Sequence, residues 1–403
     1  MLNEPKPASR SDLFTMLSEA CELEHGLACS YLFTAFSLKQ DVAEGGIDWR
    51  QLQLVRQWAA QIYFVASEEM LHLAQVWNLL AAIGGTPYYQ RPNFPQNSKY
   101  YPLGVALKLE PFGLPAIERF IAYELPTNVP AERLTMKTLS LTAGELRAGA
   151  RQTVGELYTK IAQSIAALPA DQLFIGDPAL QIGPDVVDFP DIVKVTDHDS
   201  AAKAIETITE QGEGTQADRK DCHYGAFLNI RDEFEKETAE AGETFVPARP
   251  VLENPVPRLR PDHAAGTVNL IKDAYSAAVA ELFDGVYILM LRQLQYVFSD
   301  HPKKDELVRR FARTAIVFMP TVIKPLGEAL ALLPAGGEHG TQTAGPAFAM
   351  TRHVPLPADP RVAALVAGER LAELATEADR LASDPRAPQQ LVRAAENMKR
   401  AAL

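Results

Sequence analysis

The sequence predicts an all-α protein built on a four-helix bundle, with long crossover excursions and an added C-terminal helical portion. Through most of the 403 residues, apolar side chains recur at three- and four-residue steps, which is the period of an amphipathic helix. Segments with strand character are short, the clearest being 172–176 and 192–195. Acidic and imidazole side chains interrupt several of the apolar faces. These observations favour helices that enclose a polar site.

The first two helices are expected over about 12–39 and 49–83, joined by a turn at 41–48. Glu24 lies in the middle of the apolar face of the first helix, where a charge is costly unless it is paired or bound to a metal. The second helix must run antiparallel to the first. Glu24 and Glu69 lie at similar distances from the turn, within about one helical turn of each other in depth. The two carboxylates can therefore meet.

The second helix also carries the pattern Glu69-x-x-His72. Residues three apart on a helix share a face, so both side chains can reach one point beside the axis. Helical bundles that bind two metal ions use this motif. His25 and Glu68 each adjoin a member of this set and point about 100° away from it. We expect His25 at a surface or an interface.

The middle of the chain is expected to contain, in order, a crossover over 86–112, a short helix over 115–123, a long helix over 143–168, an excursion over 169–198, and helices over 199–211 and 218–237. The long helix carries Glu156 beside its apolar seam, and the last helix carries His223. Glu124 ends the short helix before Leu-Pro and could reach the site, but a structural role is preferred.

Five prolines between positions 247 and 261 mark the clearest linker in the chain. We therefore expect a metal-binding bundle over 1–246, a Pro-rich linker over 247–263, and a C-terminal helical portion over 264–403 that packs on the bundle. That portion should hold helices over 264–298, 304–333 and 361–381. Pro320 and Pro325 should kink the second of these.

Four helices of the bundle would each bring an inward acid or imidazole. Several buried carboxylates at matching depth would leave uncompensated charge without cations. Carboxylates can bridge two divalent ions, and histidines complete each coordination sphere while leaving positions open for O₂ or substrate. The set comprises Glu24, Glu69 with His72, Glu156, and His223 with Glu210 or Glu213 nearby.

These motifs resemble the ferritin-like di-metal superfamily. More specifically, ACELEHGLACSYLFTAFSL, SEEMLHLAQVWNLLAAIGG, GELYTKIA, ITEQGEGT followed by CHYGAFLNI, and AGPAF resemble the ferritin-like proteins named for the iminophenyl-pyruvate dimer synthase domain, over about residues 10–350. Named members of that group couple two imine-type molecules derived from an aromatic amino acid. This chain lacks the extra length of those large enzymes, so the named reaction carries over poorly.

The resemblance implies two divalent metal ions, iron in the first place, with manganese and copper also compatible with these ligand types. It implies as ligands Glu24, Glu69, His72, Glu156 and His223, completed by Glu213 or Glu210. One departure concerns the last helix, where Lys220 stands in the position of the glutamate that a symmetric site would have three residues before its histidine. Whether one or two ions bind is therefore open.

The expected function is a metal-dependent, di-iron oxidoreductase or oxygenase that uses O₂ and a small organic substrate, which could be derived from an amino acid. Tyr31 is either a hydrogen-bonded core tyrosine or a catalytic residue whose phenol bonds a ligand carboxylate or donates an electron. One alternative is a metal-binding or iron-handling protein without an organic substrate. Another is a structural protein whose acids are only ion-paired.

Bulk composition limits the partners and the location. Lys and Arg number 39 against 51 Asp and Glu, a net charge of −12, which argues against nucleic acid as a partner. The first residues contain no apolar segment of the kind found in secretory signals. No uninterrupted apolar stretch reaches a membrane-spanning length of about 18 residues. Three cysteines without a CxxC pattern favour a reducing, cytoplasmic location. The C-terminal helices could form a homo-dimer interface.

Overall fold

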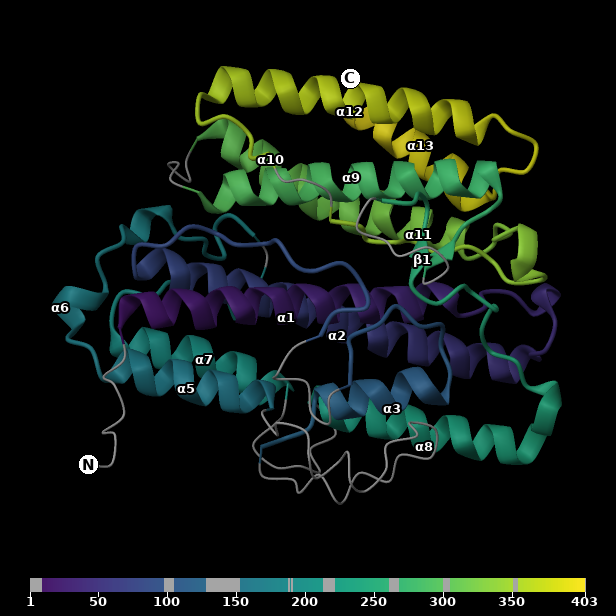
Figure 1. Ribbon diagram of the computed structural model, residues 1–403, viewed down its shortest axis with the longest axis horizontal. Coiled ribbons are helices and arrows are strands. Elements are labelled where there is room, and N and C mark those ends of the chain that lie inside the picture. The colour runs from purple at the N-terminus through teal and green to yellow at the C-terminus, as the bar shows by residue number, and fades with distance from the viewer. Residues whose placement is uncertain are drawn as a thin grey trace.

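The computed structural model describes residues 9–97, 105–127, 153–187, 189, 191–212, 222–260, 268–299, 305–350 and 354–402. Within these residues the chain is almost entirely helical, and the helices lie in stacked layers (Figure 1). The predicted all-α class is confirmed. The only paired strands among the described residues are β1 (Pro255–Val256) and β2 (Asn269–Leu270), which run parallel.

Two long, unbroken helices form the central layer of the molecule. They are α1 (Arg10–Ser37) and α2 (Trp49–Ala82), and they pack against each other along their length. Each begins at a capping box, with Ser9 before α1 and Asp48 before α2, which satisfies the free N–H groups of the first turn. The structure confirms both predicted helices.

The third and fourth helices of the bundle are each interrupted. The third consists of α3 (Leu114–Tyr123) and α5 (Val154–Ala166), and the fourth of α7 (His198–Gly212) and α8 (His223–Ala241). In Figure 1, α3 and α8 lie together below one half of α1 and α2, whereas α5 and α7 lie below the other half. Of the helix predicted over 143–168, the structure shows α5, which begins after the capping residue Thr153; residues 143–152 lie outside the described part.

The excursion after α5 contains short helical turns rather than the weak strands that the sequence suggested. Leu173 belongs to α6 (Ala170–Leu173), and residues 192–195 form no strand. The remaining short turns are η1 (Val42–Glu44), η4 (Pro178–Leu180), η5 (Gly242–Thr244) and η7 (Gly337–His339).

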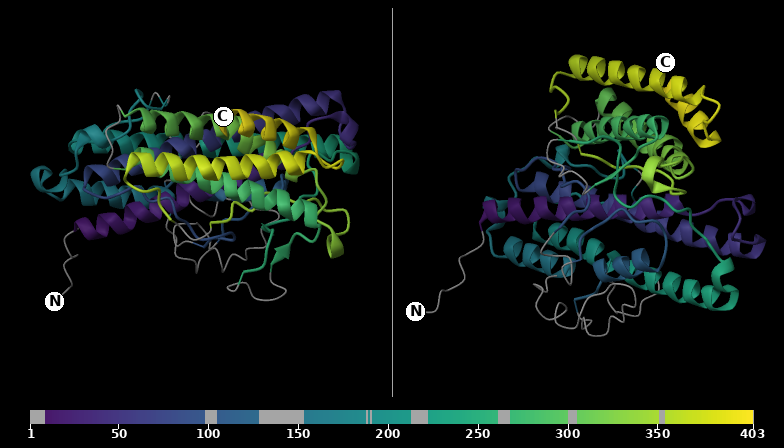
Figure 2. Two further views of the ribbon diagram at one scale, coloured as in Figure 1. Left: turned by 90° about the horizontal axis from the view of Figure 1, so that it is seen from above. Right: turned by 45° about the vertical axis from the view of Figure 1, so that its right-hand side comes forward.

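The C-terminal helices cover the face of α1 and α2 that is opposite the interrupted helices (Figures 1 and 2). The inner layer holds α9 (Ala274–Phe298), α10 (Glu306–Phe318), the π-helical turn η6 (Met319–Ile323) and α11 (Lys324–Leu330). The outer layer holds α12 (Pro360–Ala382) and α13 (Gln389–Ala402), of which α13 was not predicted. The irregularity expected at Pro320 is confirmed by η6.

The described part of the predicted linker is packed against the bundle rather than extended into solvent. Arg249 forms an ion pair with Glu44 at 2.6 Å and donates a hydrogen bond to the carbonyl of Phe36. Further along, Gly327 of α11 lies so close to Phe36 that a Cβ atom there would be 2.4 Å from the ring. The two helical parts therefore share one continuous core. The three-part division of the chain stays a prediction.

One helix, α9, is long and apolar enough to span a membrane by length and composition alone, with a mean hydropathy of 1.4 over its best window. The sequence interpretation had excluded such a segment because of its acidic residues. Of that window, 67% is buried inside the protein, between α10 and α12. Buried core helices have the same composition, so this feature is weak evidence for a membrane.

Candidate metal centre

Because the third and fourth helices are interrupted, ends of α3, α5, α7 and α8 lie at one level of the bundle. Glu124 follows the last residue of α3, and His223 opens α8. Both reach the level at which α1 presents Glu24 and α2 presents Glu69 and His72. Because α1 and α2 continue unbroken, they provide a rigid support for a site that the other helices complete.

Three carboxylates and two imidazoles form a buried cluster with approximate two-fold symmetry. Glu69 lies at its centre, with Oε2 3.3 Å from His72 Nδ1 and Oε1 2.9 Å from His223 Nδ1. Glu24 lies 3.5 Å from His72 Nδ1 on one side, and Glu124 lies 3.6 Å from His223 Nδ1 on the other. The cluster thus consists of two groups, each with two carboxylates and one histidine, that share Glu69.

Each imidazole is held through the nitrogen that faces away from the cluster. His72 Nε2 lies 3.0 Å from the side-chain oxygen of Gln211, and His223 Nε2 lies 3.2 Å from Glu68. Both partners can only accept at those atoms, so each Nε2 donates, and Nδ1 is the atom presented to the carboxylates. A hydrogen bond of this kind fixes the tautomer and ring orientation of metal-binding histidines.

Two buried tyrosines hold the outer carboxylates. Tyr158 of α5 donates a hydrogen bond to Oε1 of Glu24, and Tyr31 of α1 donates one to Oε1 of Glu124. In both glutamates, Oε2 is the atom that faces the histidine. Each tyrosine therefore occupies one oxygen and leaves the other directed into the cluster. Tyr31 is buried and its phenol is bonded to a cluster carboxylate, which fits both roles that the sequence left open for it, so its catalytic role stays a prediction.

The pKa values of the cluster show that its negative charge requires compensation by protons or cations. Burial and the charge of Glu69 raise the pKa of Glu24 to about 7. Burial would lower the pKa of His72, but Glu24 and Glu69 outweigh it and raise the pKa to about 10. Glu124 and Glu69 likewise raise the pKa of His223 well above its ordinary value, despite burial. Without other cations, the carboxylates are compensated by protons held on the two histidines.

The residues fit a metal site. His223 Nδ1 is buried and has no hydrogen-bond partner of suitable geometry, although two carboxylate oxygens lie within 4 Å of it. A buried ring nitrogen that faces two carboxylates without a well-formed hydrogen bond is unfavourable, and a cation between these groups would satisfy all of them. The cluster also borders a cavity of about 20 Å³, which can hold an ion or a water-sized molecule.

The structure brings together Glu24, Glu69, His72 and His223 of the predicted ligands, and not Glu156. Glu156 is half-buried in the first turn of α5, where its N–H bonds to the Thr153 side chain. Tyr158 points into the cluster, and a residue two positions earlier on a helix points about 200° away from it. Glu124, for which a structural role was preferred, lies in the cluster at the place expected for Glu156, and its role as a ligand is a proposal.

The fourth-helix carboxylate remains a prediction. Glu213 lies outside the described residues, as does Lys220. The alternative, Glu210, is exposed on α7 and is not among the clustered ligands.

Of two neighbours of the ligands, His25 differs from expectation and Glu68 agrees with it. His25 is buried rather than at a surface, and burial and Arg91 lower its pKa well below the ordinary value. Glu68 does lie off the face of Glu69, but it supports His223 from outside the cluster.

Comparison with known proteins gives a family and two relatives. The family model described as Ferritin-like matches residues 17–232, which is more than half of the chain. Dichlorochromopyrrolate synthase of Lentzea aerocolonigenes is 28% identical over 378 residues, which cover 85% of this chain and 36% of that protein. The 2-imino-3-(indol-3-yl)propanoate dimerase of Chromobacterium violaceum is 28% identical over 379 residues, which cover 86% of this chain and 35% of that protein.

The chain therefore spans about a third of the length of these curated relatives. No solved structure matches it. The resemblance inferred from the sequence motifs is confirmed by the family match and by both relatives.

Proposed function

Because the chain belongs to the ferritin-like family, we propose that it is a di-iron oxidoreductase or oxygenase that uses O₂ to oxidise a small, amino-acid-derived organic substrate. The observation that carries this proposal is the cluster in which Glu69 is shared between two equivalent carboxylate–histidine groups. A shared carboxylate between two such groups suits two ions rather than one. The names of both relatives, one an imino acid dimerase and the other a pyrrolate synthase, support the substrate class.

The residues of the chain would divide the work as follows. Glu24, Glu69 and His72 would hold one ion, and Glu69, Glu124 and His223 would hold the other. Bound iron supplies the redox capacity to react with O₂. Tyr158 and Tyr31 position the outer carboxylates through their hydrogen bonds, and we assign Tyr31 this positioning role rather than a direct catalytic one. Gln211 and Glu68 keep both Nδ1 atoms directed inward.

The decisive experiment compares metal content among matched variants. Protein reconstituted with Fe²⁺ under anaerobic conditions should bind about two ions per chain. Glu124→Ala should lose about one ion, because it removes an outer ligand of one group. Glu156→Ala removes a glutamate side chain that lies outside the cluster, on α5, and should retain the full iron content. The proposal fails if the wild type binds no more iron than the Glu69→Ala/His72→Ala double variant.

Substrate is tested separately, with imino acids generated in place from phenylalanine or tryptophan by an amino acid oxidase, with catalase present. We expect O₂ uptake in excess of that of the oxidase and catalase alone, and this excess should depend on iron, on the imino acid and on Glu69. Uptake that accompanies Fe²⁺ addition alone, and that the imino acid does not change, would support the alternative of an iron-handling protein. The small size of the described cavity at the cluster, about 20 Å³, is the observation that keeps this alternative open.

The remaining expectations about the setting of the protein stay predictions. Cys21, Cys29 and Cys222 are buried and form no disulfide bond, and the reducing, cytoplasmic location stays a prediction. A homo-dimer, like the absence of nucleic acid partners, is tested by none of the features described.

A further inference from the structure

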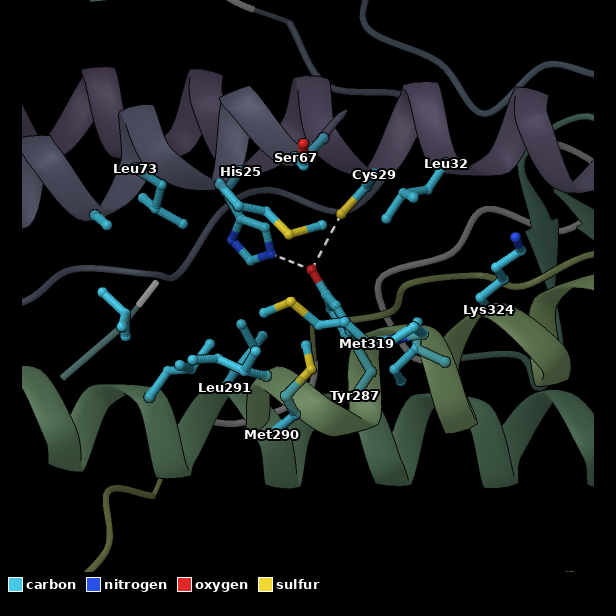
Figure 3. Close-up of a pocket in the computed structure, with 18 of the residues that line it drawn as sticks. His25, Cys29, Leu32, Ser67, Leu73, Tyr287, Met290, Leu291, Met319 and Lys324 are labelled. Carbon is cyan, nitrogen blue, oxygen red and sulfur yellow. Dashed lines mark hydrogen bonds between the residues drawn. The ribbon is translucent and has the colours of Figure 1, made fainter. Parts of the chain in front are cut away.

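A second and much larger cavity lies on the other side of the α1–α2 layer, between it and the inner C-terminal layer (Figure 3). Its volume is about 350 Å³. Helix α2 contributes Leu73 and Trp77 to its wall, α9 contributes Met290, Leu291 and Leu294, and η6 contributes Met319. Ser67 and Pro320, both exposed, lie at its mouth.

A cavity of this size and composition is characteristic of a ligand site. Protein interiors are otherwise close-packed, with few voids larger than a water molecule. Small-molecule sites have volumes of roughly 300–1,000 Å³, apolar walls and a few placed polar groups. Met70, Met290 and Met319 give this wall flexible, polarizable side chains that adapt to a ligand. The π-helical turn η6, which forms one edge of the cavity, is a feature that recurs at functional sites.

The cavity is separate from the metal centre although it shares two helices with it. On α1, Glu24 faces the cluster and the next residue, His25, faces the cavity. On α2, Glu69 faces the cluster and Met70 faces the cavity. Consecutive helical residues point about 100° apart, so the body of the helix lies between the two sites. A molecule in the cavity would therefore contact the C-terminal layer and not the metal ligands.

One polar chain reaches the otherwise apolar wall, and its hydrogen positions follow from its partners. His25 Nδ1 lies 2.7 Å from the carbonyl of Tyr89, which can only accept, so Nδ1 donates. The other nitrogen of this neutral, buried ring accepts from the Tyr287 hydroxyl. The Tyr287 oxygen then receives the thiol of Cys29, at 3.1 Å, and a second contact from the buried Arg91 guanidinium, which lies outside the wall of the cavity (Figure 3). A thiol is a weak donor, so an N–H or O–H group of a ligand could replace it.

The cation at the edge of the cavity is already engaged. Lys324 lies over the ring of Tyr63 at 4.3 Å and pairs with Glu328 at 4.0 Å. No free charge in the described wall therefore favours a carboxylate, as a fatty acid site would require. Aromatic side chains, among them Phe36, Trp77 and Phe298, instead supply faces for ring contacts.

We propose that this cavity binds a flat, largely apolar aromatic molecule that donates one hydrogen bond, through N–H or O–H, to the Tyr287 oxygen. The site is distinct from the metal centre and does not depend on the proposed oxidation. Its wall is assembled from α1, α2, α9 and η6, so binding would also hold the C-terminal layer against the bundle.

The test uses two probes that differ only in the donor, 2-naphthol and 2-methoxynaphthalene, titrated calorimetrically into the metal-reconstituted full chain. We expect one site per chain for 2-naphthol and an affinity about tenfold lower for the methyl ether, since one hydrogen bond is lost. Tyr287→Phe should remove most of this preference. Tyr275→Phe, the same change elsewhere on α9, should retain it, because Tyr275 bonds to the Leu381 carbonyl outside the cavity.

Two substitutions that fill the space, Leu294→Trp in the wall and Met319→Trp near the mouth, should abolish binding of both probes while circular dichroism and metal content stay unchanged. The proposal is overturned if wild-type protein binds neither probe, or if the folded filling variants bind as the wild type does. It is also overturned if Glu69→Ala/His72→Ala loses 2-naphthol binding, because the probe would then occupy the metal centre. If one tryptophan variant fails to fold, the other variant still tests the proposal, as does the loss of preference for 2-naphthol over its methyl ether in Tyr287→Phe.

Discussion

Metal loading should release protons, and their number follows from the pKa values of the cluster. His72, with its pKa raised to about 10, carries a proton at neutral pH, and so does His223, whose pKa is raised well above its ordinary value. Each must lose the proton on Nδ1 before that nitrogen can bind a metal ion. The two histidines thus contribute about two protons at any pH between 6 and 8.

Glu24 adds a third, pH-dependent contribution. Its pKa of about 7 means that it is roughly nine-tenths protonated at pH 6 and one-tenth protonated at pH 8. Release should therefore be about three protons at pH 6 and about two at pH 8. Because protons compete with the metal for these atoms, the apparent affinity falls as the pH falls. The overall binding constant for both ions should decrease about 100- to 1,000-fold per pH unit.

Titration calorimetry with Mn²⁺, which avoids reaction with O₂, measures this number in buffers that differ in ionisation enthalpy. The slope of the observed enthalpy against the buffer enthalpy gives the protons released. Glu24→Gln should make the number of protons released per bound ion the same at both pH values, whereas Glu156→Gln should behave as the wild type does. Release below one proton, or a release that does not change with pH in the wild type, would refute the charge assignment of the cluster.

Four further substitutions test the metal site and the packing of the fold. Tyr158→Phe should lower metal affinity about 10- to 100-fold in competition with a chelator, because an outer carboxylate loses its anchor, while the fold remains. Glu110→Ala leaves the buried Arg119 without its partner at 2.6 Å and should cost about 3–5 kcal/mol of unfolding free energy in urea; an unchanged midpoint would contradict this ion pair. Gly327→Ala should cost about 1–3 kcal/mol through its clash at the interface between bundle and C-terminal layer. Gly368→Ala, in open space on α12, should be neutral or slightly stabilising.

Much of the fold and about half of the site could be predicted from helical periodicity. It identified the unbroken helices and the inward faces of Glu24, Glu69 and His72, because a regular helix fixes which residues share a face. The same rule failed for the third helix. Glu124 lies one residue beyond the end of α3, where the helical repeat no longer determines direction. An inward residue on the predicted continuous helix, Glu156, was chosen in its place.

The second cavity could not have been predicted by that route. It depends on the packing of segments more than 250 residues apart, as in the bond between Cys29 and Tyr287. The sequence also suggested that His25, one position from a metal ligand, would face a surface, because the layer formed by α9 to α11 was not assigned to that side of the bundle. Once that layer is in place, both faces of α1 and α2 are interior faces, and each carries its own polar group.

The charge balance of the cluster indicates the charge of any further ligand of a metal-loaded centre. Three carboxylates and two protonated histidines leave about one net negative charge, which is acceptable for a buried site without metal. Two divalent ions against the same carboxylates and neutral histidines leave about one net positive charge instead. A loaded centre of these residues therefore has room for one further anion. Either Glu213 supplies it, or the carboxylate of an amino-acid-derived substrate does, and iron content measured in Glu213→Gln with and without an imino acid separates these cases.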